Sequence, residues 1–155
     1  MFDVLDRIAE IDGRYATDQE LVELEQLSQM TIDRFQLYSK LAQAEERILN
    51  ELYQRVSASH PQIFQMEGRD VSVQCRHDVR YTFHHAVQSM LLGEAWLQED
   101  LLIWFQTITR SRKIQPRCEV VYSALENLLR SALPPKESQL ICPIIRKIKE
   151  TLIQP

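Results

Sequence analysis

Apolar residues recur every three or four positions along most of the chain, which is the spacing of amphipathic helices. The first such run predicts a short helix over residues 3–11, and Gly13 ends it. A T-x-x-E capping box at residues 17–20 then predicts the start of a long helical stretch. This stretch ends at His60-Pro61, because a residue before proline avoids the helical region. Its length predicts about two or three separate helices.

The same spacing continues in the second half of the chain, between short segments that break helices. Residues 61–70 contain Gly68 and predict a loop, and the basic RSRK segment at residues 110–113 predicts a solvated turn. The expected helices cover residues 72–92, the segment from Gly93 to Ile108, the segment from Pro116 to Pro134, and a last segment containing Ile144 to Leu152. In total, about seven or eight helices are expected in a single domain over residues 1–155. This count predicts an all-α, globin-like fold, although other helical bundles have similar numbers of helices.

The composition agrees with a helical domain and excludes several classes of protein. The 155 residues suffice for one hydrophobic core, and only three are glycine, whereas tight hairpins use glycine in their turns. A net charge of −4 gives no basis for a nucleic-acid partner. No apolar run reaches the roughly 18 residues of a membrane span, and the N-terminus lacks the basic and apolar regions of a signal peptide.

The three cysteines bear on the compartment in which the protein works. Cys75, Cys118 and Cys142 are odd in number and form no C-x-x-C motif. They therefore suit free thiols in a reducing cytoplasm better than a disulfide scaffold. Cys118 and Cys142 are interpreted as structural.

Candidate chemistry is concentrated in the segment QCRHDVRYTFHH at residues 74–85. Cys75 and Asp78 are three residues apart, so they share one face of the predicted helix. Arg76 and Arg80 are four residues apart, and like charges at that spacing are better tolerated when an anion lies between them. In the simpler interpretation, Cys75 is a small buried apolar residue and the arginines form a solvated surface.

In the functional interpretation, the segment binds a ligand with an electrophilic carbon, buried N–H groups and carboxylates. The Cys75 thiolate would add to the carbon, and Arg76, Arg80 and His77 would lower the pKa of that thiol. Asp78 would accept hydrogen bonds from the N–H groups, and the arginines would pair with the carboxylates. A bilin, which is a linear tetrapyrrole, has all three features.

Three segments resemble the phycobiliprotein family, the α and β subunits of cyanobacterial light-harvesting antennae. Residues 12–17, Asp-Gly-Arg-Tyr-Ala-Thr, resemble the turn between the two extra N-terminal helices of that family. Residues 75–78, Cys-Arg-His-Asp, resemble its Cys-x-Arg-Asp bilin-attachment motif, and residues 93–102 resemble its Gly-Asp-Ala-x-x-Leu-x-Asp segment. The order and spacing of the three segments make the resemblance specific. It implies a globin-like fold with two extra N-terminal helices.

The resemblance also implies a role for each residue of the site. Cys75 would bond a phycocyanobilin-like bilin through a thioether, and Asp78 would hold the inner pyrrole nitrogens. His77 replaces the arginine of the family motif, so Arg76 would pair with a propionate instead. The expected bilin-binding residues are Cys75, Arg76, His77, Asp78, Arg80, Tyr81 and Trp96, and no catalytic or metal-binding residue is expected.

Two features depart from the family pattern. His84 and His85 stand where the family has an Arg-Tyr pair, and the arginine of that pair meets an acidic residue of a partner subunit. Glu10 stands at the acidic position, so a histidine opposite it weakens the expectation of normal antenna ring assembly. His77 and His84 are seven residues apart, which also leaves open a haem or metal site.

Three functions are therefore considered: an antenna subunit, an auxiliary bilin-binding protein, and a colourless regulatory or interaction paralogue. The retained Cys75 and Asp78 disfavour the third, and the histidines disfavour the first. We expect the second, in bilin biosynthesis, carriage or phycobilisome assembly, and no nucleophile–base pair suggests an enzyme. The expected partners are the bilin, a second copy or a related subunit bound through the N-terminal helices, and proteins of bilin biosynthesis or the phycobilisome. The expected location is the cytoplasm, with the cytoplasmic face of the thylakoid as an alternative.

Overall fold

The computed structural model describes residues 9, 13–93 and 102–154, which form five helices and one short hairpin. In chain order the elements are α2 (Asp18–Ser59), β1 (Gln65–Met66), β2 (Arg69–Asp70), α3 (Ser72–Leu92), α5 (Ile103–Arg112), α6 (Gln115–Ala132) and α7 (Pro135–Ile153). The all-α class predicted from the sequence is confirmed. The helix expected over residues 3–11 lies almost wholly outside the described residues, so the predicted number of helices is not tested.

α2 is a single helix of 42 residues, so the expected division into two or three helices is wrong. Residues 18–59 contain neither glycine nor proline, and the backbone therefore offers no point of interruption. The predicted capping box is present, because the Glu20 amide donates to Thr17 Oγ1 at 3.3 Å and the Thr17 amide donates to Glu20 Oε2 at 2.7 Å. Arg14 pairs with the same carboxylate and, together with the Thr17 bonds, lowers the pKa of Glu20 to about 2.

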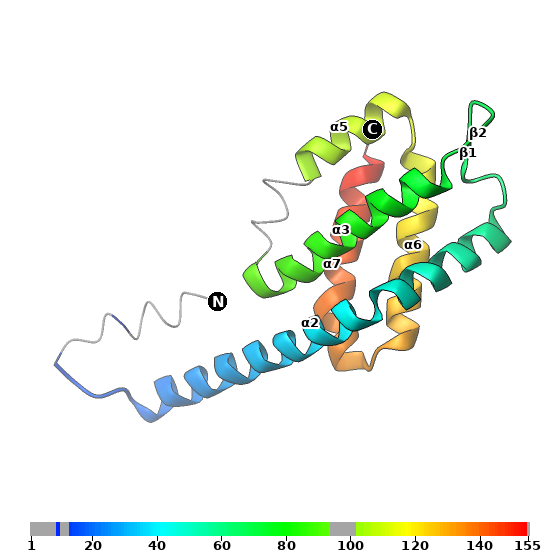
Figure 1. Ribbon diagram of the computed structural model, residues 1–155. Helices are drawn as coiled ribbons and strands as arrows, with labels where there is room; N and C mark the ends of the chain where they lie inside the picture. Colours follow the sequence, from blue (N-terminus) through cyan, green and yellow to red (C-terminus); the bar gives the residue numbers. More distant parts are fainter. Residues whose placement is uncertain (1–8, 10–12, 94–101, 155) are drawn as a thin grey trace.

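The body of the molecule is built on α6 and α7, which pack against each other, with α2 and α3 lying across them (Figure 1). α5 packs on the C-terminal end of α7, where Gln106 Nε2 donates to Thr151 O at 3.0 Å. No described helix is long and apolar enough to cross a membrane. The most buried core side chains include Leu49, Leu52, Phe83, Leu125, Ile145 and Ile148.

The connections between the helices agree with the sequence in part. α3 and the first turn of α6, which contains Pro116, lie where they were predicted. The loop at residues 61–70 contains the β1–β2 hairpin, and Gly68 in its turn has a φ of 76°. The turn predicted at residues 110–113 is wrong for its first three residues, because α5 continues to Arg112 and Lys113 alone adopts a left-handed conformation, with φ of 53°.

A buried chain of hydrogen bonds fixes α3 against α6 beside Asp78. Tyr122 Oη of α6 donates to Thr82 Oγ1 of α3 at 3.0 Å. Thr82 Oγ1 in turn donates to the backbone oxygen of Asp78 at 2.8 Å. Because Tyr122 is only 2% exposed, a hydroxyl without this partner would carry the full cost of its lost hydration. The bond therefore favours one orientation of α3 relative to α6.

Candidate ligand-binding site

Cys75 and Asp78 lie one turn apart on α3 and line the same small cavity between α3, α5 and α6. The cavity has a volume of about 60 Å³. Phe105 of α5 and Cys118 and Tyr122 of α6 also line it. We call it the thiol cavity, because two buried free cysteines, Cys75 and Cys118, line it.

A larger cavity of about 340 Å³ adjoins the thiol cavity along α3. His77 and Tyr81 of α3 and Trp104 of α5 line only this second space, which we call the aromatic cavity. Its volume is at the lower end of the roughly 300–1,000 Å³ typical of ligand pockets. The two cavities together are the α3 pocket, and they share the lining residues Gln74, Asp78, Phe105, Ile108 and Arg112.

Asp78 is the acidic residue at the junction of the two cavities. Its Oδ1 atom accepts a hydrogen bond from Gln74 Nε2 at 2.7 Å. His77 Nδ1 lies 3.9 Å from the same oxygen, a weak contact at that distance. Its side chain is 36% exposed, so the carboxylate is held in place while part of it stays open to a ligand.

Cys75 is almost fully buried, and burial raises the pKa of its thiol. This result is opposite to the prediction that Arg76, His77 and Arg80 lower that pKa. Burial dominates because it disfavours the charged thiolate, so Cys75 is mainly a neutral thiol near neutral pH.

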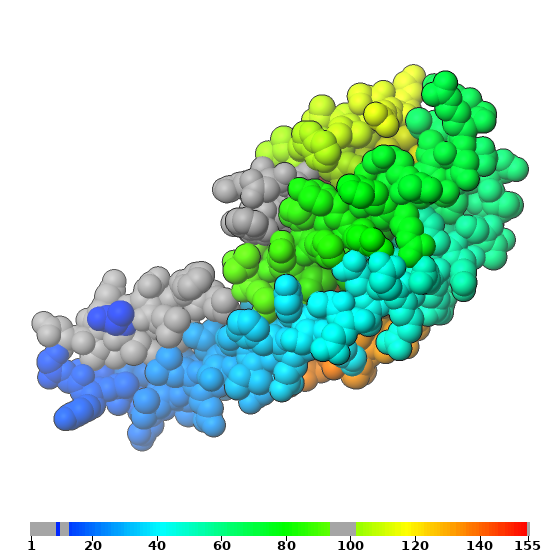
Figure 2. Space-filling view, viewed as in Figure 1, coloured from blue at the N-terminus to red at the C-terminus, as the bar shows by residue number. Residues whose placement is uncertain are grey.

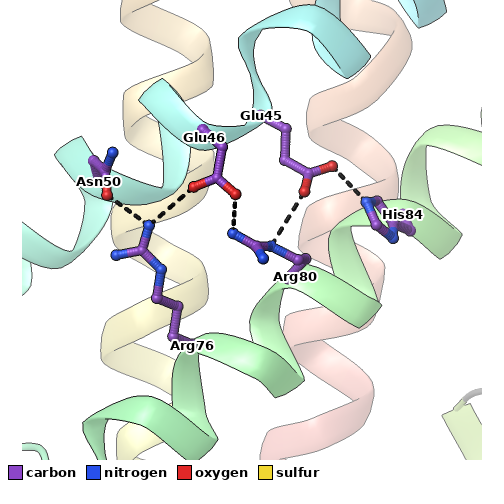
Figure 3. Close-up of polar contacts among 6 residues, drawn as sticks. All are labelled: Glu45, Glu46, Asn50, Arg76, Arg80 and His84. Carbon is purple, nitrogen blue, oxygen red and sulfur yellow. Dashed lines mark hydrogen bonds and ion pairs between the residues drawn. The ribbon is translucent and has the colours of Figure 1, made fainter.

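Arg76 and Arg80 point to α2, and neither lines a cavity of the α3 pocket (Figure 3). Arg76 Nη2 donates to Asn50 Oδ1 at 2.5 Å and lies 3.3 Å from Glu46 Oε2. Arg80 pairs with Glu46 through Nη2, and its Nε lies 3.2 Å from Glu45 Oε1. The anion expected between the two arginines is therefore Glu46, which α2 provides.

His84 continues this row of contacts one turn further along α3, where its Nε2 contacts the Glu45 carboxylate (Figure 3). The acidic position expected opposite it, Glu10, lies outside the described residues. His77 instead lines the aromatic cavity, so the two histidines do not meet at one haem or metal site. Within residues 13–93 and 102–154, no group of three or more His, Cys, Asp or Glu side chains could hold a metal ion.

The remaining site residues predicted from the sequence lie at the aromatic cavity or beyond the described residues. Tyr81 lines the aromatic cavity and packs against His85, with ring centroids 4.3 Å apart. The His85 ring also contacts the backbone oxygen of Tyr81, at 2.9 Å from Nδ1. Trp96 lies outside the described residues, so its expected contact with the ligand is not tested.

Eight of the described pocket residues come from α5 and α6, and none of them was predicted as a site residue. They are Trp104, Phe105, Ile108, Arg112, Arg117, Cys118, Val121 and Tyr122. Arg112 follows Ile108 by four positions, so helical spacing would have placed both on one face if residues 110–113 had not been interpreted as a turn. No local pattern connects the α6 residues with α3, because their proximity depends on how the helices pack.

Because burial raises the pKa of the Cys75 thiol, we expect this thiol to react slowly in the protein without ligand. Alkylation of Cys75 by iodoacetamide should be slow at pH 7 and rise about tenfold per pH unit while the thiol remains mostly protonated. Cys118 should react later still, because burial raises its pKa to about 12. Peptide mass spectrometry after timed labelling measures both rates. A Cys75 rate that levels off below pH 8 would show a thiol activated by nearby cations instead.

The chain matches a protein-family model described as "Phycobilisome protein" over residues 7–152. This range contains α2, both cavities of the α3 pocket and the contacts drawn in Figure 3. Among curated proteins, none matches the chain significantly.

Proposed function

The chain belongs to the phycobilisome protein family, and we propose that it binds a bilin in the α3 pocket. The family has a globin-like fold, which agrees with the helical body described above. The observation that carries the proposal is that Cys75 and Asp78 line one cavity between α3, α5 and α6. A thiol that can bond a bilin and a carboxylate that can hold pyrrole N–H groups thus come from a single helical turn.

Cys75 is the proposed attachment residue. Its sulfur would add to the exocyclic double bond of the bilin A ring, and the thiol proton would pass to the neighbouring ring carbon. The addition therefore needs neither an oxidant nor a reductant. The thiol cavity, at about 60 Å³, has room for only the attached end of the ligand. The remaining rings would occupy the aromatic cavity.

Asp78 is the proposed partner of the pyrrole nitrogens. It borders both cavities, so its carboxylate faces a ligand that extends from one cavity into the other. The hydrogen bond from Gln74 orients this carboxylate before a ligand arrives. Tyr81 and Trp104 would cover the ligand with aromatic surface, which suits a flat conjugated molecule.

We propose an auxiliary, non-enzymatic role in bilin biosynthesis, carriage or phycobilisome assembly, within the cytoplasm. In antenna proteins the residue at the position of His84 contacts a partner subunit. Here His84 contacts Glu45 of its own chain instead, which favours the auxiliary role. A light-harvesting antenna subunit is the second candidate, and the family match favours it.

We further propose that the N-terminal half of α2 binds a second copy of the chain. Figure 2 shows this half of the helix, in blue, extending away from the helical body. Leu21, Ile32 and Phe35 share one face of it and are 51%, 46% and 57% exposed. An apolar stripe of this kind is typical of a surface that a partner covers.

Removal of this surface should produce a monomer. Replacing the exposed Phe35 in Phe35→Asp should convert a dimer of the full chain into a monomer, because the change removes apolar contact area and places a charge on this surface. Sedimentation velocity at micromolar concentration measures the state. Lys149→Gln, on α7, is a control that should leave the dimer intact. A full chain that is already monomeric would contradict the proposal.

The proposed function is tested by producing the protein together with a bilin-forming pathway. Purified wild-type protein should be coloured, with about one bilin per chain, because each chain has one proposed attachment residue, Cys75. The double variant Cys75→Ala/Asp78→Asn should lose most of the colour, since it lacks both the bond and the charge. A colourless wild-type protein, folded by circular dichroism, would overturn the bilin-binding function.

A further inference from the structure

Two arginines of the α3 pocket have no acidic partner in the part of the chain that the structure describes. Arg112 completes α5 and lines both cavities, and Arg117, in the first turn of α6, lines the thiol cavity. Neither forms an ion pair within residues 13–93 and 102–154. Among the described residues that line the pocket, Asp78 is the acidic one, so these lining residues carry more positive than negative charge.

The surroundings of Arg117 make an anion favourable at this place. A cation in the first turn of a helix faces the partial positive charge of the helix N-terminus, which disfavours it. Arg117 Nε donates to the backbone oxygen of Ile63 at 2.9 Å, which anchors the side chain. This guanidinium forms no other hydrogen bond or ion pair among the described residues, so its two terminal amino groups are available to a ligand. A carboxylate bound there would be stabilised by both the guanidinium and the helix N-terminus.

The two arginines of α3, Arg76 and Arg80, differ from Arg112 and Arg117 because they already have acidic partners. Arg76 and Arg80 are held by acidic side chains of α2, and the guanidinium of Arg76 also lies 5.6 Å from the centre of the Tyr53 ring. A ligand carboxylate would have to compete with Glu46 for either of them. At Arg112 and Arg117, a ligand carboxylate would not have to displace an acidic side chain of the described residues.

We propose that Arg112 and Arg117 bind the carboxylates of the ligand, so that the pocket selects linear tetrapyrroles with free carboxylates over their esters. This inference rests on the proposed bilin-binding function. It assigns the carboxylate contacts to α5 and α6, on the side of the pocket opposite the attachment helix. The motif resemblance implied instead that Arg76 receives a propionate.

The test compares biliverdin with its dimethyl ester, which has the same conjugated system and no free carboxylate. Titrations followed by absorption should show that wild-type protein binds the free acid about tenfold more tightly or better, because charge-assisted hydrogen bonds to carboxylates are lost in the ester. Arg112→Gln and Arg117→Gln should each reduce this ratio by about threefold or more. Arg110→Gln, which changes an exposed arginine of α5 that lines neither cavity, and Arg80→Gln should leave it unchanged.

A further variant separates the effect of the positive charge from that of the guanidinium group. Arg117→Lys keeps the positive charge but changes the anchor to Ile63, so it should retain more of the preference than Arg117→Gln. Equal affinity of wild-type protein for acid and ester would overturn the inference and leave the bilin-binding function standing. A preference lost in Arg80→Gln but kept in Arg112→Gln and Arg117→Gln would also overturn it. Failure of folded wild-type protein to bind either compound would overturn the function and the inference together.

Discussion

Replacing Cys75 by alanine should abolish covalent attachment of the bilin while leaving a pocket that still binds it reversibly. The thioether has no other proposed source, so zinc-enhanced fluorescence of the denatured protein band should be bright for wild type and absent for Cys75→Ala. The native variant should keep some colour, because Asp78 and the aromatic cavity are unchanged. The expected loss in the denatured band is complete.

The matched control is Cys118→Ala, which removes the other thiol of the same cavity. Its denatured band should stay as bright as wild type, since the higher pKa of Cys118, about 12, makes it the poorer nucleophile at neutral pH. A fluorescent Cys75→Ala band that disappears only in the double variant would move the attachment to Cys118. A dark wild-type band beside a coloured native protein would show binding without a bond.

Asp78→Asn should change the colour of the bound bilin more than the amount bound. The substitution keeps the size of the side chain but removes the counter-ion of the protonated ring system. Free bilins absorb weakly in the red because a helical conformation dominates, and holding the ligand extended raises the red band relative to the near-ultraviolet band. The ratio of these two bands should therefore fall in Asp78→Asn.

The same variant should make the bound bilin easier to deprotonate. Charge-assisted hydrogen bonds contribute roughly 1.5–3 kcal/mol each, so losing one should lower the pKa of the ligand by about one to two pH units. Absorption spectra recorded across a pH titration measure both effects. Glu119→Gln removes an exposed acid of α6 and should alter neither. An unchanged band ratio and ligand pKa in Asp78→Asn would remove Asp78 from the site.

The sequence predicted those parts of the site that depend on a single helix. Spacing alone placed Cys75 and Asp78 on one face of a helix over residues 72–92, and the structure has that helix with both residues at one cavity. The capping box at the start of α2 was equally local, because Thr17 and Glu20 are three residues apart. Such features follow from helix geometry without knowledge of the neighbouring helices.

Features that depend on helix packing could not be predicted in this way. Spacing placed Arg76 and Arg80 together and predicted an anion between them, but it could not show that Glu46, 30 positions before Arg76, provides it. The direction of the Cys75 pKa shift was wrong because neighbouring charges are visible in the sequence, whereas burial by other helices is not. Arg112 was missed because α5 extends further than its basic composition suggested.

Whether a bilin is bonded to Cys75 can be read from the mass of the peptide that contains this residue. Wild-type protein produced with a bilin-forming pathway should be digested, and its three cysteine-containing peptides should be weighed. The Cys75 peptide is predicted to carry the mass of one bilin, with no loss of hydrogen, because the thiol adds across a double bond. The Cys118 and Cys142 peptides should be unmodified. An unmodified Cys75 peptide from coloured protein, or a bilin on either of the other two cysteines, would rule out Cys75 as the single attachment residue.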